Sequence, residues 1–260
     1  MAGLLESFES PRIAMIQGAS RGIGLEIARQ LLEERGFDTV IATSRDPDKS
    51  RGLRELERDH PASLHAVALD VTDEDTVRGA REEVGAIVES LGLLFNVAGV
   101  LHDDTSGLKP ERSLRDIDPS NFAHSFAVNA TGPILVAKHF ADLMPRQAPA
   151  VFANMSARVG SIGDNYKGGW YAYRASKAAQ NQLTRTLSIE MARRHKGTIC
   201  VALHPGTVDT ELSKPFQARV PDEQLFSVER AASQLLDVID ALSPDDTGGF
   251  FDWAGEPIEW

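Results

Sequence analysis

A strand, a glycine cluster and a helix follow one another in IAMIQGASRGIGLEIARQLLEE, residues 13–34. The first five residues read as a buried β-strand, and the next seven, Gly18 to Gly24, have the spacing G-x-x-x-G-x-G. Helical periodicity then runs over 23–34 and stops at Gly36. A strand that turns through glycines directly into a helix is typical of the first unit of a parallel α/β sheet.

The alternation of strand and helix continues along the whole chain. Apolar runs predict strands over 13–17, 39–43, 64–69, 93–97, 150–155, 197–203 and 249–253. Periodic segments predict helices over 23–34, 51–59, 122–141 (interrupted at Gly132-Pro133), 172–194 and 229–242, with Thr72 or Asp73 as the cap of a further one. The strands are apolar throughout, so helices should cover both faces of the sheet.

These patterns predict one α/β domain over residues 1–260, with no linker or internal repeat. Its core would be a doubly wound parallel sheet of about seven strands flanked by helices. The segment at about 207–228 carries prolines and charges and predicts a loop or lid over a substrate site.

Composition excludes several classes of protein. The chain has 260 residues, of which 42% are hydrophobic, and this is enough for one sizeable core. The net charge of −11 and the pI of about 5.1 argue against nucleic acid and acidic membranes as partners. Neither a secretory signal nor a membrane span is evident, Cys200 has no second cysteine to pair with, and the histidines show no metal-ligand grouping. We expect a soluble cytoplasmic protein without a metal site.

The glycine cluster predicts a phosphate-binding turn. Gly18 would permit the tight turn, Gly22 would let the backbone approach a pyrophosphate, and Gly24 would let helix and strand pack closely. The helix N-terminus then offers free N–H groups to the phosphates. An ordinary strand–helix turn is the alternative, but the place directly after the first strand favours a dinucleotide.

The end of the second strand indicates which dinucleotide binds. It reads Thr43-Ser44-Arg45, where an enzyme that prefers NAD(H) usually has a carboxylate for the ribose hydroxyls. Arg45, together with Arg21 in the glycine cluster, could clamp a 2′-phosphate. We therefore expect NADP(H) to be preferred, with NAD(H) possible. The alternative is that both arginines are ordinary solvated charges.

Tyr173 and Lys177 predict proton-transfer chemistry. Their i, i+4 spacing places both side chains on one face of the helix predicted over 172–194. A free phenol has a pKa near 10, and a nearby ammonium group or an oxidised nicotinamide would favour the phenolate. Neither Tyr166 nor Tyr171 has a lysine four residues later. The pair by itself is common in proteins, so its meaning depends on the other motifs.

The motifs occur in a fixed order: Gly18-Ala-Ser-Arg-Gly-Ile-Gly24, Asp70-Val71, Asn96-Val97-Ala98-Gly99, Asn129, Ser156, Tyr173-x-x-x-Lys177 and Pro205-Gly206-x-Val208-x-Thr210. From about residue 13 to the C-terminus the chain resembles the classical short-chain dehydrogenases/reductases, which have a Rossmann fold. The segments around Ser156 and Tyr173, and the tail GGFFDWAGEPIEW, resemble the branch of C-factor-like and sniffer-like carbonyl reductases.

The resemblance implies a role for each matching residue. Tyr173 would be the general acid in reduction, Lys177 would lower its pKa and hold the nicotinamide ribose, Ser156 would orient the substrate oxygen, and Asn129 would hold a water linked to Lys177. The implied cofactor-binding set is Gly18, Ser20, Arg21, Gly22, Ile23, Gly24, Ser44, Arg45, Asp70, Val71, Asn96, Ala98, Gly99, Tyr173, Lys177, Pro205, Gly206, Val208 and Thr210. Local structural roles remain open as alternatives: a cap at a kink for Asn129, a strand-end cap for Ser156, a turn cap for Asp70 and a helix cap for Thr210.

Two departures from the family pattern stand out. Val97 replaces the second Asn of the usual Asn-Asn-Ala-Gly, which removes one side-chain amide. The spacing from Ser156 to Tyr173 is longer than is commonest, so the surplus should loop out within 162–170. Tyr166 and Trp170 could then form an aromatic wall for the substrate. The alternative is a surface loop with incidental aromatic residues.

The leading prediction is an NADP(H)-dependent oxidoreductase that moves a hydride between nicotinamide and a small carbonyl or alcohol substrate. One alternative is a dinucleotide-binding signalling or sensor protein of the C-factor type with little turnover. A methyltransferase that uses S-adenosylmethionine is another, but it leaves Arg45 and the Tyr173–Lys177 pair unexplained. The helices predicted over 122–141 and 172–194 correspond to those that pair in the family, so a homodimer or homotetramer is expected.

Overall fold

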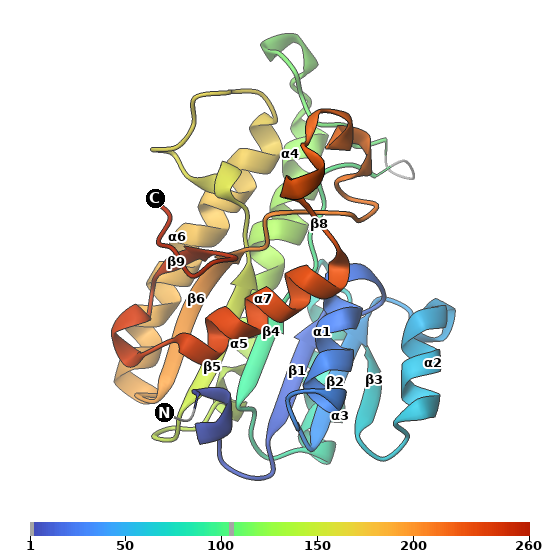
Figure 1. Ribbon diagram of the computed structural model, residues 1–260, viewed down its shortest axis with the longest axis vertical. Helices are drawn as coiled ribbons and strands as arrows, with labels where there is room; N and C mark the ends of the chain where they lie inside the picture. The colour runs from blue at the N-terminus through green and yellow to red at the C-terminus, as the bar shows by residue number, and fades with distance from the viewer. Residues whose placement is uncertain (1–2, 104–106) are drawn as a thin grey trace.

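Seven parallel strands form the centre of the molecule (Figure 1). The computed structural model describes residues 3–103 and 107–260. The sheet order is β3-β2-β1-β4-β5-β6-β9. The strands are β1 (Ile13–Gln17), β2 (Thr39–Ser44), β3 (Leu64–Ala68), β4 (Leu93–Asn96), β5 (Ala150–Met155), β6 (Thr198–His204) and β9 (Phe250–Asp252). The predicted doubly wound parallel sheet is confirmed.

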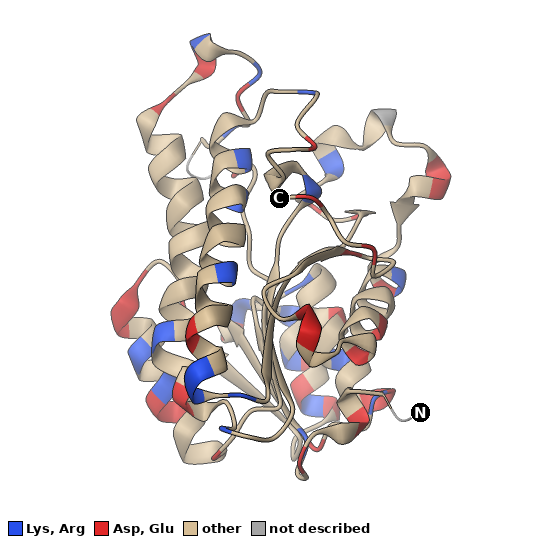
Figure 2. Cartoon of the chain, turned by 90° about the vertical axis from the view of Figure 1, so that its left-hand side faces the viewer, with Lys and Arg blue, Asp and Glu red and all other residues tan. Residues whose placement is uncertain are grey.

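Alternate side chains of the central strands enter two different cores. In β1, Ala14 and Ile16 belong to one hydrophobic cluster, whereas Ile13 and Met15 belong to the other. Both faces of the strand are thus removed from water, which explains why its sequence is apolar throughout and does not alternate. Figure 2 shows the result: charged residues lie on the helices and loops, and the strands seen edge-on are almost free of them.

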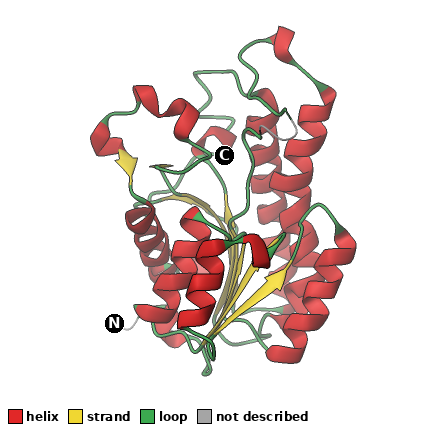
Figure 3. Ribbon diagram, turned by 90° about the vertical axis from the view of Figure 1, so that its right-hand side faces the viewer, coloured by secondary structure: helices red, strands yellow, loops and turns green. Residues whose placement is uncertain are grey.

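Helices cover both faces of the sheet (Figure 3). On one face pack α1 (Gly22–Glu33), α2 (Arg51–Asp59) and α7 (Val228–Ala241). On the other face lie α3 (Glu74–Ile87), α4 (Pro119–Phe126), α5 (Gly132–Phe140) and α6 (Tyr171–Arg194). Asp73 is the N-cap of α3, since its side chain accepts a hydrogen bond from the Asp75 amide. None of the described helices is long and apolar enough to cross a membrane.

The long helix predicted over 122–141 is not one regular helix. It begins earlier, at Pro119, and the turn Ala127–Thr131 is a π-helix between α4 and α5. The interruption therefore precedes the predicted one at Gly132-Pro133. Pro133 directly follows this turn in a continuous helical stretch, and because it has no N–H it cannot donate a hydrogen bond back to the turn. The widened turn carries Asn129, and such turns often occur at functional sites.

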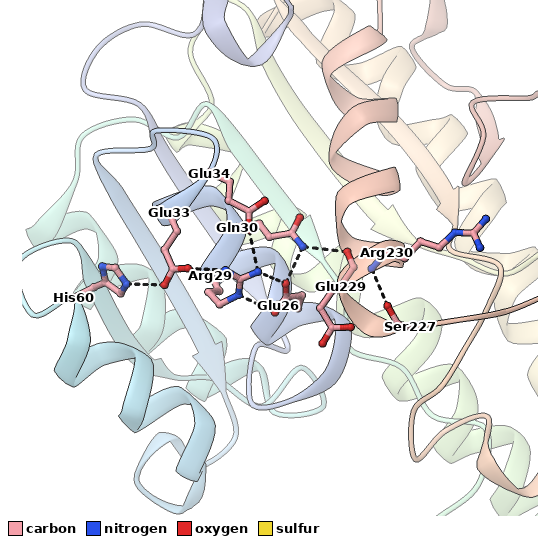
Figure 4. Close-up of polar contacts among 9 residues, drawn as sticks. All are labelled: Glu26, Arg29, Gln30, Glu33, Glu34, His60, Ser227, Glu229 and Arg230. Carbon is pink, nitrogen blue, oxygen red and sulfur yellow. Dashed lines mark hydrogen bonds and ion pairs between the residues drawn. The ribbon is translucent and has the colours of Figure 1, made fainter.

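A polar network fixes α1 to its neighbours (Figure 4). Arg29 donates to the carboxylates of Glu26, Glu33 and Glu34 on its own segment. Glu33 also contacts His60, which ends α2, at 3.1 Å. The buried Gln30 amide donates to the carbonyl oxygen of Glu229, at the start of α7, at 3.0 Å. The helix that follows the glycine cluster is thus fixed at both flanks.

The segment predicted as a lid has a stem that the sequence did not predict. Two short parallel strands, β7 (Thr207–Val208) and β8 (Leu225–Phe226), pair with each other. Between them the chain forms short 3₁₀ turns, including Lys214–Arg219. The segment lies beyond the carboxyl ends of the main strands (Figure 1).

Candidate active site

The glycine cluster lies where the sheet changes direction. The chain proceeds from β1 to β2 and β3 on one side and to β4 and β5 on the other, so a crevice forms at the ends of β1 and β4. Gly18 has a φ of +88°, and its amide donates to the Thr43 carbonyl oxygen. A Cβ on Gly24 would lie 2.3 Å from the Gly18 carbonyl oxygen. Gly24 therefore lets α1 pack against the turn, as its position in the sequence predicts.

The groups around this crevice fit an anionic dinucleotide. No side chain caps α1, so its first N–H groups stay available to a phosphate. Arg21 and Arg45 are both exposed, and neither forms an ion pair with any residue that the structure describes. Ser44, directly before Arg45, is buried with a hydroxyl that has no partner among the described residues. Ser20 presents its carbonyl oxygen inward, where it accepts from the Ser50 hydroxyl.

One face of α6 brings a second set of polar groups to the end of β5. Tyr173, Lys177 and Asn181 follow at intervals of four and are all buried. Lys177 Nζ donates to the Met155 carbonyl oxygen at 2.7 Å and to Gln180 Oε1 at 3.0 Å. Ser156 Oγ donates to Asn181 Oδ1 at 2.6 Å. The helix thereby places Tyr173 and Lys177 beside Ser156.

Burial disfavours charge on both Tyr173 and Lys177. It raises the pKa of the Tyr173 phenol well above its ordinary value and lowers the pKa of Lys177 to about 7. Lys177 Nζ lies 6.0 Å from the centroid of the Tyr173 ring. Among the described residues, the Tyr173 hydroxyl is not hydrogen-bonded to Lys177 or to Ser156. The protein alone therefore holds the phenol in its protonated form.

Asn129 joins the loop after β4 to α6. Its amide donates to the Val100 carbonyl oxygen at 2.8 Å and to Ser176 Oγ at 3.0 Å, and its Oδ1 accepts from the Val100 amide. A Cβ on Gly99 would lie 3.4 Å from Asn129 Oδ1 and 3.6 Å from Lys177 Nζ. Asn129 and Lys177 thus flank the same point. Its side chain bonds Val100 and Ser176 and makes no capping hydrogen bond at the π-turn or at the start of α5, both of which the structure describes, so the alternative of a cap at a kink is wrong.

The side chain of Asn96 lies in the interior and is not directed at the cofactor crevice. Its side chain is fully buried and donates to Asn154 Oδ1 at 2.9 Å, and Asn154 donates to Thr184 Oγ1 at 2.8 Å. This chain of amides connects β4, β5 and α6 below the site. Direct contact with the cofactor would fall to the backbone of the following residues, Ala98 and Gly99. Ala98 lies against Gly18, since a Cβ there would come within 2.6 Å of the Ala98 amide.

Four other predicted cofactor residues use their side chains in packing or capping. Ile23 packs against a small core at the lid stem that includes Val208. Val71 packs against the start of α5, since a Cβ on Gly132 would lie 2.7 Å from Val71 Cβ. Asp70 Oδ1 accepts from the amide and hydroxyl of Thr72, so Asp70 does cap the turn. Contacts of these residues with a cofactor would involve the backbone or, for Asp70, the second oxygen.

The Pro205-Gly206 segment brings the lid stem over the glycine cluster. Gly206 has a φ of +79°, and a Cβ there would lie 2.6 Å from the Phe226 ring. Thr210 Cγ2 lies 3.6 Å from the position of a Cβ on Gly22. Thr210 does not cap the following 3₁₀ turn, whose N-cap is Ser213. The predicted residues from the two ends of the chain therefore meet at one edge.

A row of aromatic rings lies beside Tyr173. Trp170 contacts the Tyr173 ring at 6.3 Å between centroids and the Phe216 ring of the lid at 4.8 Å. His102 continues the row, 6.1 Å from Phe216. The prediction for Tyr166 is wrong: the residue is 88% exposed, so it forms no wall of the site. Trp170, at the base of the same loop, is the residue that faces the site.

Comparison with known proteins identifies the family. Residues 12–221 match the family model described as short chain dehydrogenase. The chain belongs to the short-chain dehydrogenase family. It is therefore a nicotinamide-dependent oxidoreductase, and the sequence-based resemblance is confirmed.

Solved structures of this family superpose over almost the whole chain. A carbonyl reductase from chicken fatty liver, solved with bound NADPH, is 29% identical with a TM-score of 0.84, and the match covers 100% of this chain and 99% of that one. Carbonyl reductase Sniffer of Drosophila melanogaster is 26% identical with a TM-score of 0.83, over 97% and 100% of the two chains. Among curated relatives, C-signal of Myxococcus xanthus is 36% identical over 65% of this chain and 92% of its own length.

Several residues of this dehydrogenase site were missed in the sequence. Asn181 and Thr184 continue the polar face of Tyr173 and Lys177 at helical spacing, so buried polar periodicity could have indicated them. Phe216 and Glu111 lie in loops, where no periodic pattern places a side chain. In the part of the chain that the structure describes, no cluster of His, Cys, Asp or Glu could hold a metal.

Proposed function

We propose that the protein is an NADP(H)-dependent carbonyl reductase that transfers a hydride to a small carbonyl compound, with Tyr173 as the proton donor. The observation that carries the proposal is the face of α6, which presents Tyr173 and Lys177 at the end of β5 and holds Ser156 there through Asn181. A site that only bound a dinucleotide would have no need of a buried phenol beside a serine hydroxyl.

The residues of this chain divide the chemistry as follows. A bound nicotinamide supplies or accepts the hydride. Ser156 orients the substrate oxygen, and Tyr173 gives its proton to that oxygen as negative charge develops on it. Burial keeps the Tyr173 phenol protonated before reaction. In the oxidative direction, a protonated Lys177 would favour the phenolate, and Asn129, on the other side of Gly99, would hold the path by which the proton returns.

The preference for NADP(H) rests on Arg21 and Arg45. Both are exposed guanidinium groups at the crevice without a carboxylate partner among the described residues, although the chain as a whole is acidic. A 2′-phosphate on the adenosine ribose would give them one. The NADPH bound to the chicken carbonyl reductase agrees with this preference.

The substrate side is formed by Trp170, Phe216 and His102, and we propose that residues 207–228 act as its lid. His102 Nε2 contacts the carbonyl oxygens of Glu211 and Leu212 at 3.1 and 3.2 Å, so the lid is tied to the loop after β4. Because carbonyl oxygens only accept, Nε2 carries the proton. The rings favour an apolar substrate.

Association through α4, α5 and α6 into a homodimer or homotetramer belongs to the same proposal. Together with α3, these helices cover one face of the sheet. Sedimentation of the purified protein over a range of concentrations would test it. The cytoplasmic location stays a prediction from the sequence.

The second candidate function is a signalling protein that binds the dinucleotide with little turnover. Its support is the likeness to C-signal, which covers 65% of this chain. It leaves the arrangement of Ser156, Tyr173 and Lys177 without a purpose.

The test is loss of nicotinamide absorbance with NADPH or NADH and a panel of aldehydes, ketones and quinones. Wild type should oxidise NADPH, and Tyr173→Phe should lose at least about a hundredfold in kcat while binding NADPH normally. Tyr171→Phe is the matched control, since Tyr171 lies two residues away on the same helix and is partly exposed. Tight NADPH binding without turnover, with this panel and with alcohols and NADP, would favour the signalling protein.

A further inference from the structure

The catalytic helix α6 begins in an unusual way. The three residues before it, Gly168, Gly169 and Trp170, all have positive φ angles, of 61°, 69° and 51°. Two of them are glycines, which adopt this conformation readily, but Trp170 is the only non-glycine residue with a positive φ in the described chain. Trp170 also occupies the N-cap position, where its side chain has no oxygen to accept from the first amides of the helix.

Glu111, from the loop after β4, supplies the missing acceptors. Its carboxylate Oε2 accepts from the amide of Ala172 at 3.2 Å, and its main-chain oxygen accepts from the amide of Trp170 at 2.6 Å. Its second carboxylate oxygen, Oε1, is buried without a partner among the described residues, and the whole residue is only 1% exposed. Burying a carboxylate with one unpaired oxygen costs free energy of folding, and the hydrogen bond from the Ala172 amide offsets only part of that cost.

Arg174 holds the same turn from the opposite side. Its guanidinium donates to the carbonyl oxygens of Gly169 and Gly168 at 3.0 and 3.2 Å, and to that of Val159 at 3.2 Å. The left-handed turn is thus fixed between Glu111 and Arg174. Its last residue, Trp170, contacts both Tyr173 and the lid ring Phe216.

We propose that Glu111 is a positioning residue for catalysis: by capping α6 from a distant loop, it fixes the first turn that carries Tyr173 and holds Trp170 against the lid. The proposal rests on the proposed function, in which Tyr173 donates the proton. A shift of the helix start by a fraction of an ångström would move the phenol relative to Ser156, and such errors lower kcat steeply. The glycine cluster and the two arginines proposed to hold the phosphates of NADPH lie on other elements, so NADPH affinity should change little.

The experiment compares substitutions of Glu111 that distinguish the effects of its hydrogen-bond acceptor, its charge and the length of its side chain. Glu111→Ala removes the cap and should lower kcat about tenfold or more at an unchanged Kd for NADPH. Glu111→Gln keeps an acceptor for the Ala172 amide and should retain at least about half of kcat. Glu111→Asp keeps the charge but is one methylene shorter, so kcat should fall. Asp116→Ala is the control, because Asp116 caps a short exposed turn of the same loop, at Ser113.

Amide hydrogen exchange at residues 170–174, in all four variants and wild type, provides a readout that does not depend on turnover. Faster exchange in Glu111→Ala and Glu111→Asp, but not in Glu111→Gln or Asp116→Ala, supports the capping role of Glu111 independently of turnover, and the matching loss of kcat supports its role in catalysis. Wild-type kcat and exchange in Glu111→Ala would overturn the proposal. If Glu111→Ala does not fold, an active Glu111→Asp with slow exchange beside an impaired Glu111→Gln would overturn it equally, since charge and not the cap would then matter.

Discussion

The indole of Trp170 lies 4.8 Å from the phenyl ring of Phe216, centroid to centroid, although the two residues come from different loops. Trp170 adopts a left-handed backbone conformation to reach this contact, which costs roughly 1–2 kcal/mol for an L-residue. Strain of this kind is kept where the surrounding structure enforces it, often at functional sites. The contact joins the lid to the start of the catalytic helix.

Trp170→Ala and Phe216→Ala should each raise KM for flat, apolar carbonyl substrates about tenfold, because each removes a ring that would cover the substrate. KM for a short aliphatic aldehyde should change little. Tyr166→Ala removes an aromatic side chain of the same loop that points to solvent, and should leave all constants unchanged. Steady-state kinetics with both substrate types would decide. Equal KM values in Trp170→Ala and wild type would indicate that the aromatic residues are incidental.

Gly24→Ala should weaken cofactor binding and destabilise the protein, because the new Cβ would stand 2.3 Å from the backbone oxygen of Gly18, so that α1 or the turn must shift. We expect a loss of stability of about 1–3 kcal/mol. Gly79→Ala, within α3, is the matched control, since nothing lies within 4 Å of a Cβ there. It should stabilise the protein by about 0.5–1 kcal/mol. Urea unfolding and NADPH titration measure both effects, and normal NADPH affinity in Gly24→Ala would contradict the packing argument.

Arg45→Ala should weaken NADPH binding at least about tenfold and leave NADH binding unchanged, because only NADPH carries the 2′-phosphate. Arg21→Ala should behave in the same way. Arg51→Ala provides the control: Arg51 is an equally exposed arginine on α2 that is already paired with Glu55 at 2.8 Å. Fluorescence titration with the two dinucleotides tests the prediction. A parallel loss of affinity for both would mean that these arginines do not read the 2′-phosphate.

Asn181→Asp should lower kcat about tenfold or more without changing the Kd for NADPH. The Ser156 hydroxyl donates a hydrogen bond to Asn181 Oδ1, and Asn181 Nδ2 is buried without a partner among the described residues. If the side-chain amide of Asn181 flipped, its Nδ2 would donate to Ser156 Oγ, and the serine hydroxyl could then donate to the substrate oxygen. The carboxylate of an aspartate could only accept, so it would keep the serine hydroxyl bound to itself. Gln182→Glu on the exposed face is the control. Full activity of Asn181→Asp would show that catalysis does not require the Asn181 amide to flip.

Lys177→Met should change how stability depends on pH. Burial lowers the pKa of Lys177 from 10.5 to about 7, so between these values the unfolded chain holds a proton that the folded protein lacks. Lys177 therefore makes the stability of the wild type rise with pH between about pH 7 and pH 10.5. Below pH 7 the folded protein bears the full free-energy cost of a buried, charged ammonium group. Lys177→Met lacks this cost, so its stability relative to wild type should decline from pH 7 toward pH 10. Melting temperatures at several pH values test this, with Lys138→Met, an exposed lysine, as the control. A constant difference would place the pKa of Lys177 outside the window.

The sequence by itself determined the parallel sheet and the glycine turn at its crevice, and it named the site residues that the proposed function uses. Continuous apolar runs and helical periodicity are local consequences of burial, and Gly18 to Gly24 is a local turn, so they can be read from neighbouring residues. The spacing of Tyr173 and Lys177 is equally local, because a helix brings positions four apart onto one face.

Only the tertiary structure decided which loop segments surround the sheet and the first turn of α6. The cap of α6 by Glu111, the contact of Trp170 with Phe216 and the paired strands β7 and β8 all join segments far apart in the chain. No local pattern encodes such contacts, because loop side chains follow no period and their partners are fixed only when the elements pack. The same reason explains Tyr166: its place in the surplus loop between Ser156 and Tyr173 predicted a wall residue, but in the folded protein it is exposed to solvent.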